Sequence, residues 1–178
     1  MNSATKYLVL PLILGCSTSV ALADDKESGQ EYKVILQPLN SSGVYGEAEL
    51  EIKKGKIIKI EIEANGLEAN KPHPQHIHGH DAPVKNATCP GVDADVDADG
   101  LISVGEGLPS YGPIVLPLTP FNLVGDSGEL EYEASFTVNP SSIQPLHKRT
   151  IILHGMTVNG VYIPSLPVAC GEIAIDQD

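Results

Sequence analysis

The chain has 178 residues, a formal net charge of −12 and only 4% aromatic residues. This length suits a single domain with a substantial core. The acidic balance argues against binding to nucleic acid or to anionic lipid surfaces, and the lack of tryptophan gives no indication of an aromatic-lined cleft.

The first 23 residues have the pattern of an export signal. Lys6 precedes an apolar run over residues 7–14, and the small-residue sequence Ala21-Leu22-Ala23 forms a cleavage site before Asp24. The run is too short to span a membrane. We therefore expect a signal peptide over 1–23 and one domain over 24–178 that works outside the cytoplasm, in a periplasm or after secretion. An alternative stays open, since residues 12–16 resemble a lipoprotein cleavage box that would put a lipid anchor on Cys16.

Beyond the signal, apolar and charged residues alternate with a period of two. The clearest stretches are 47–52, 58–63 and 130–138, and further strands are expected at 32–39, 149–154 and 172–175. One apolar and one charged face is typical of antiparallel strands half-buried in a sandwich or barrel. We therefore predict an all-β domain. Residues 70–120 and 156–168 resist strand assignment, so we expect two loops there that carry the function.

Residues 95–106 match the twelve-residue calcium loop of an EF-hand. The template needs carboxylates at positions 1, 3 and 5, a glycine at 6, a backbone carbonyl at 7, a polar group at 9 and a bidentate glutamate at 12. These positions hold, in order, Asp95, Asp97, Asp99, Gly100, Leu101, Ser103 and Glu106. An acidic solvated loop would account for the aspartates, but not for the glycine and glutamate at their spacing. The sequence thus predicts a Ca²⁺ site.

The flanks of this loop differ from those of an EF-hand. Prolines and glycines are dense at 89–91 and at 107–113, and both residue types interrupt helices. We therefore expect a calcium loop without flanking helices.

Four of the six histidines fall within eight residues, at positions 73, 76, 78 and 80. On a strand, residues i and i+2 share a face, so His76 and His78 can offer two imidazoles to one metal ion. Imidazole suits copper and zinc. His154, at the end of the apolar run 150–153, is the natural third ligand. We expect His73 and His80 to be accessory or solvated, and His147 to lie in a turn.

Two cysteines remain once the signal is removed, Cys89 and Cys170. An oxidising compartment would pair them, and two buried free thiols are the alternative.

Taken in order, these features resemble the copper/zinc superoxide dismutases. The ordered landmarks are Gly46, the Gly66-Leu67 turn, His76-Ile77-His78, Cys89, Arg149-Thr150, His154 and residues 169–175. The resemblance implies an eight-stranded Greek-key β-barrel. It also implies a Cys89–Cys170 disulfide that ties the long loop to the last strand, and copper ligands at His76, His78 and His154.

The chain departs from that family at two places. It has no histidine between His80 and His147, where the family holds its zinc ligands, and the calcium loop occupies this stretch instead. We therefore expect no zinc site of the family type. Pro167 stands where the family has an arginine that guides its anionic substrate. The chain also resembles a family of domains named after chordin, which has a similar histidine pattern.

Three functions follow from the sequence. The favoured one is an exported domain that binds calcium through the loop and copper through the three histidines. A copper-only superoxide dismutase of weak activity and a structural secreted calcium-binding domain without copper are the alternatives. Metal ions are the partners expected from the sequence, which leaves the oligomeric state open.

Overall fold

The structure is a computed structural model that describes residues 1, 29–81 and 85–177. The expected signal peptide, except Met1, and the possible anchor at Cys16 lie outside the described residues. Among the residues described, no helix is long and apolar enough to cross a membrane.

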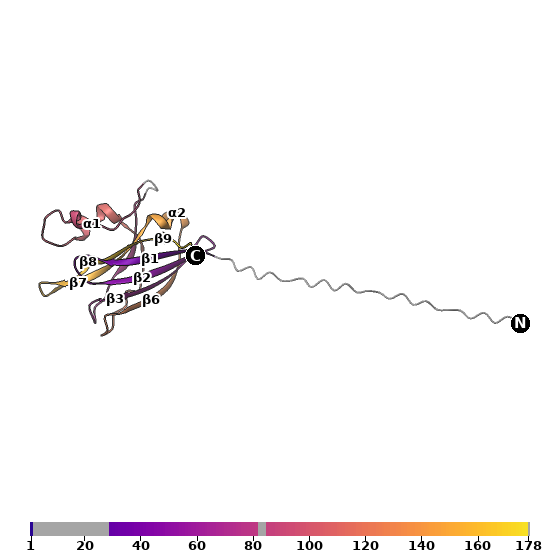
Figure 1. Cartoon of the computed structure of the whole chain (residues 1–178), viewed down its shortest axis with the longest axis horizontal. Helices are drawn as coiled ribbons and strands as arrows, with labels where there is room; N and C mark the ends of the chain where they lie inside the picture. The colour runs from indigo at the N-terminus through magenta and orange to yellow at the C-terminus, as the bar shows by residue number, and fades with distance from the viewer. Residues whose placement is uncertain (2–28, 82–84, 178) are drawn as a thin grey trace.

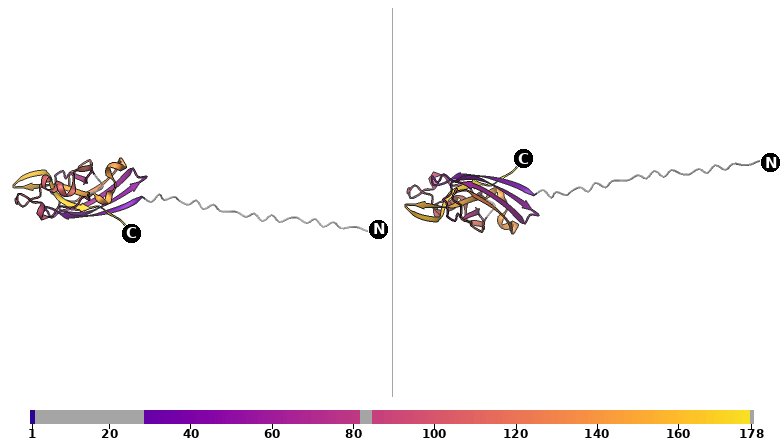
Figure 2. Two further views of the ribbon diagram at one scale, coloured as in Figure 1. Left: turned by 90° about the horizontal axis from the view of Figure 1, so that it is seen from above. Right: turned by 90° about the horizontal axis from the view of Figure 1, so that it is seen from below.

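Nine strands of the described chain form one curled antiparallel sheet (Figures 1 and 2). Its order is β5-β4-β7-β8-β1-β2-β3-β6, and β9 pairs with β1. The strands are β1 Gln30–Pro38, β2 Tyr45–Lys53, β3 Ile57–Asn65, β4 Gln75–His78, β5 Ile114–Pro117, β6 Leu130–Thr137, β7 Thr150–Val158, β8 Val161–Glu172 and β9 Ala174–Ile175. The predicted all-β fold is confirmed.

The alternation in the sequence becomes the two faces of this sheet. In β3, the side chains of Ile58, Ile60 and Ile62 are buried, whereas those of Glu61 and Glu63 are exposed. β2 and β6 flank β3 and repeat the pattern in register. Burying each isoleucine contributes about 1.5–3 kcal/mol, so the inner face of these strands holds the main core.

The loop predicted over 156–168 is instead a β-hairpin. β7 continues to Val158, and β8 begins at Val161, which pairs with it. Asn159 and Gly160 between them have φ angles of +50° and +80°. An Asn-Gly pair between two strands is the strongest local sequence signal for a tight hairpin turn.

Short helical segments lie between some of the strands along the chain. Figure 1 shows α1 and α2 apart from each other. They are η1 Val92–Ala94, α1 Val104–Tyr111, α2 Pro140–Ile143 and η2 Leu146–Lys148. The expectation of a calcium loop without helices is therefore wrong, because α1 begins inside the loop.

Local capping explains why α1 forms despite its proline. The Ser103 side chain accepts from the Glu106 N–H, and the Glu106 carboxylate accepts from the Ser103 N–H. This capping box satisfies two donors of the first turn. Pro109 lies in the second half of the helix, where its missing N–H removes a single internal bond. The helix then ends at Gly112, which has a φ of +76°.

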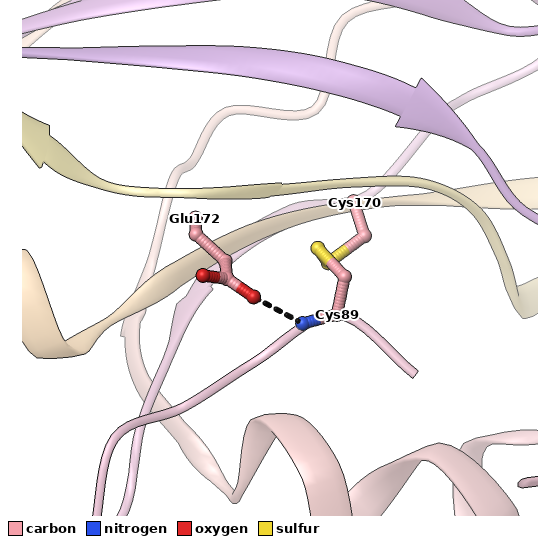
Figure 3. Close-up of a disulfide and its surroundings, with 3 residues drawn as sticks. All are labelled: Cys89, Cys170 and Glu172. Atoms are coloured by element: carbon pink, nitrogen blue, oxygen red, sulfur yellow. Dashed lines mark hydrogen bonds between the residues drawn. A yellow bond between two sulfur atoms is a disulfide. The ribbon is translucent and has the colours of Figure 1, made fainter. Parts of the chain in front are cut away.

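A disulfide joins Cys89 to Cys170, as the resemblance implied (Figure 3). It ties the long loop after β4 to the buried end of β8, and the Cys89 N–H donates to the Glu172 carboxylate at 3.2 Å beside it. The bond therefore anchors the segment that leads into the acidic loop.

We predict that reducing this disulfide lowers the free energy of unfolding by about 4 kcal/mol, because it frees a closed loop of more than eighty residues in the unfolded chain. Urea unfolding with and without a reductant measures the difference. The Cys89→Ser/Cys170→Ser variant should show no response to the reductant. Two titratable thiols in the denatured, unreduced protein would contradict the prediction.

Candidate metal centre

The structure brings His76, His78 and His154 together. Their ligand atoms lie within 4.8 Å of one another, and the ring centroids are 5.1 to 5.8 Å apart. β4 and β7 are paired neighbours, with His76 opposite Ile152. His154 lies two residues beyond Ile152, so strand alternation puts all three imidazoles on one face. Ile77, between the two β4 histidines, is buried in the main core.

Backbone carbonyls fix two of these rings. Nδ1 of His78 lies 2.8 Å from the Gly112 oxygen, and Nδ1 of His154 lies 2.8 Å from the Ser165 oxygen. A carbonyl can only accept, so each Nδ1 carries the proton and each Nε2 keeps its lone pair. These two Nε2 atoms and Nδ1 of His76 are buried without a hydrogen-bond partner.

Burial keeps the three imidazoles uncharged. It lowers the pKa of His154 to about 3 and that of His76 to about 4, and it also lowers the pKa of His78. Near neutral pH, all three nitrogens are therefore available as donors to a metal ion. Unsatisfied buried donors and acceptors are rare in folded proteins. Three such nitrogen atoms close together are what a shared metal ion would need as ligands.

Helix α1 supplies a support for this cluster that the sequence did not reveal. The Tyr111 ring packs edge-on against His78, with centroids 4.8 Å apart, and its hydroxyl donates to the Val104 oxygen at 3.1 Å. Burial raises the pKa of Tyr111 to about 12, so the phenol stays protonated. The ring also lies against Gly107, where a Cβ would come within 2.3 Å of it. The glycine that argued against a helix is thus what admits the aromatic ring.

The other histidines lie elsewhere. His73 is buried rather than solvated, and its two ring nitrogens lie 3.0 Å from the backbone oxygens of His154 and Glu68. It therefore supports the backbone at His154. His80 is half-buried near the Ser110 oxygen, and His147 is exposed in η2, in the turn where it was expected.

Arg149, noted in the sequence only as a landmark, is buried in a structural role. Its Nε donates to the Ile143 oxygen at 3.1 Å, and another guanidinium nitrogen donates to the His80 oxygen at 2.5 Å. The side chain lies directly over Gly79, where a Cβ would be 2.3 Å away. Its donors therefore hold loop carbonyls in place.

The acidic loop brings three aspartates together. Carboxylate oxygens of Asp95, Asp97 and Asp99 lie within 4.8 Å of one another, and Gly100 has a φ of +87°. The Glu106 carboxylate accepts from the N–H groups of Ser103 and Val96, at 2.8 and 3.0 Å. The Ser103 bonds are the main cause that lowers the pKa of Glu106. One glutamate thus joins the two ends of the loop.

Asn40 fixes this loop to the sheet. Its amide nitrogen donates to the oxygens of Ile102 and Pro167, at 3.0 and 2.9 Å, and its oxygen accepts from the Ile102 N–H. The loop is therefore held at β8 by Asn40 and at β4 by the contact of α1 with His78. Asn40 was not singled out by sequence reasoning, because nothing near it in the chain indicates a partner 62 residues away.

Comparison with known proteins gives distant structural similarities only. No protein-family model matches the chain, and no curated protein matches it. Superoxide dismutase 5 of Candida albicans, in its Cu(II) form, is 14% identical with a TM-score of 0.49, over 84% of this chain and 95% of that one.

Two further solved structures are similarly distant. The clock protein EA4 is 14% identical with a TM-score of 0.48, over 83% of this chain and 96% of that one. A double mutant of a superoxide dismutase-like protein from Bacillus subtilis is 17% identical with a TM-score of 0.44, over 79% and 95%.

We predict that the metal-free protein loses stability as the pH falls from about 6.5 to about 4. Unfolded imidazoles take up protons near 6.5, whereas folded His76 and His154 stay neutral down to about 4 and 3. The unfolded state binds more protons in this window, so the free energy of unfolding rises with pH there.

Urea unfolding of metal-free protein at pH 7 and pH 5 measures this effect. A His76→Gln/His154→Gln variant provides the control, since glutamine does not titrate. The drop in stability between the two pH values should be smaller in the variant. An equal drop in both proteins would show that other groups cause it.

Proposed function

We propose that this chain is an exported metal-binding domain that holds copper through His76, His78 and His154 and calcium in the loop 95–106. The observation that supports copper binding is the set of three uncharged imidazoles, two buried and one half-buried, whose free nitrogens are buried together without hydrogen-bond partners. Three nitrogen donors without a carboxylate suit copper.

The chain's own residues would hold the ion in a defined geometry. The Gly112 and Ser165 carbonyls orient His78 and His154 through Nδ1, and Tyr111 limits the movement of the His78 ring. Such partners of a ligating histidine fix its tautomer and raise its basicity. Bound copper would supply one-electron chemistry between Cu(I) and Cu(II).

Efficient superoxide turnover is the less favoured function. Pro167 occupies the place expected for a guiding arginine, and the Arg149 donors are engaged by backbone carbonyls. A net charge of −12 also repels an anionic substrate. We therefore propose copper binding with at most slow dismutation.

Calcium would neutralise the acidic loop. Three aspartates with oxygens within 4.8 Å repel one another, and Glu106, at position 12 of the template, would supply the bidentate ligand. The structural alternative, a secreted domain that binds calcium alone, leaves the three imidazole nitrogens without a role.

We predict that Cu(II) added to the metal-free protein gives an electron paramagnetic resonance spectrum of a nitrogen-coordinated site. His76→Ala and His154→Ala should each weaken copper binding by about tenfold or more, because each removes one donor and leaves the others misaligned. His147→Ala is the matched control, since His147 is exposed and is not part of the cluster. A spectrum unchanged by both ligand substitutions would place the copper elsewhere.

We predict that calcium raises the melting temperature. Binding to the folded state alone adds about 2.7 kcal/mol at a hundredfold excess over Kd. Glu106→Gln should abolish most of this rise, because it removes a bidentate ligand, whereas Glu129→Gln, on an exposed turn, should keep it. Identical melting curves with calcium and with chelator in the unaltered protein would contradict the proposal.

A further inference from the structure

The three histidines lie at the floor of an apolar bowl. The bowl is open to solvent and has a volume of about 550 Å³, within the usual range for a small-molecule pocket. Its walls come from α1, from β5, from the segment that follows β5 and from β8. Sequence reasoning did not reveal it, because the wall is built of aliphatic side chains, prolines and one phenylalanine from segments far apart in the chain.

At the opening of the bowl, large apolar side chains are exposed to solvent. Val104 and Leu108 of α1 are 37% and 42% exposed, and Ile114 of β5 is 50% exposed. Single exposed apolar residues are ordinary, but here three of them surround the same opening above a cluster of polar nitrogens. Phe121 extends this wall down to the floor, where its ring lies 5.4 Å from that of His76.

The bowl offers no charge to a ligand. Within the part of the chain that the structure describes, no residue that lines it is charged. Among the described residues that line it, the polar side chains are those of the three histidines and Ser165, and the free nitrogens of the imidazoles have no hydrogen-bond partner. The walls would therefore add little to the affinity of a small anion for the metal. An apolar ligand, in contrast, would gain affinity because it displaces water from the walls.

We propose that this bowl binds a small uncharged molecule with an apolar, ring-sized body and one nitrogen or oxygen donor. The donor would coordinate the metal held by the three histidines, and the body would pack on Leu108, Ile114 and Phe121. This inference rests on the proposed copper site and specifies the class of its ligand.

Three probes with the Cu(II)-loaded protein test it: 4-phenylimidazole, imidazole and azide. 4-Phenylimidazole and imidazole share a donor and differ by the apolar ring. Changes in the copper spectrum give each Kd. We expect 4-phenylimidazole to bind at least tenfold more tightly than imidazole. Azide, which has no apolar ring, should not bind more tightly than imidazole. Equal affinity for the two imidazoles, or tightest binding of azide, would overturn the proposal.

Substitutions in the wall show where the advantage arises. Leu108→Ser and Ile114→Ser should each reduce the affinity for 4-phenylimidazole several-fold and leave that for imidazole unchanged. Val161→Ser is the matched control, since Val161 is 64% exposed on the hairpin and does not line the bowl. An equal effect of all three substitutions would overturn the assignment of the ligand to this bowl.

Two further measurements test the bowl, one independently of the proposed copper site and one against its alternative occupant. Saturation-transfer NMR of metal-free protein with 4-phenylimidazole reports on the walls alone, and a signal that Leu108→Ser removes supports the ligand class even where copper fails to bind. Sedimentation velocity tests the other occupant, a second copy of the chain. A concentration-dependent dimer that Leu108→Ser dissociates would overturn the small-molecule proposal.

Discussion

The pairing of β4 with β7 is the interaction on which the rest of the site depends. It places His76 and His78 beside His154 on one face, while Ile77 and its neighbours Ile151 and Leu153 enter the core on the other. The core residues fix the register, because a slip of one residue would exchange the two faces. The same packing that stabilises the domain therefore sets the positions of three uncharged imidazoles.

Helix α1 connects the two candidate metal sites physically. Its first turn contains Glu106, which closes the acidic loop, and its last residue, Tyr111, and the capping residue Gly112 contact His78. Any shift of the loop that moves this short helix also moves the carbonyl that sets the His78 tautomer. The disulfide at Cys89 and the Asn40 bridge limit such movement at the start and middle of the segment.

Charge is divided unevenly over the molecule. Outer faces of β2, β3 and β6 carry rows of glutamates, among them Glu49, Glu61 and Glu133, which face solvent. The bowl above the histidines lies against the other half of the sheet and is apolar. A protein that is strongly acidic as a whole thus presents, next to its histidine cluster, a pocket whose lining side chains carry no charge.

The sequence by itself determined the alternating strands, the three histidines and the match to a calcium loop, because these follow from periodicity and from spacing along one short segment. It also predicted the Cys89–Cys170 pairing through the resemblance. Tertiary structure decided the rest. Only packing shows that α1 forms over Pro109, that Tyr111 and Asn40 support the sites, and that His73 is buried. The apolar bowl belongs to the same group, since its walls are brought together by long-range strand pairing that no local pattern records.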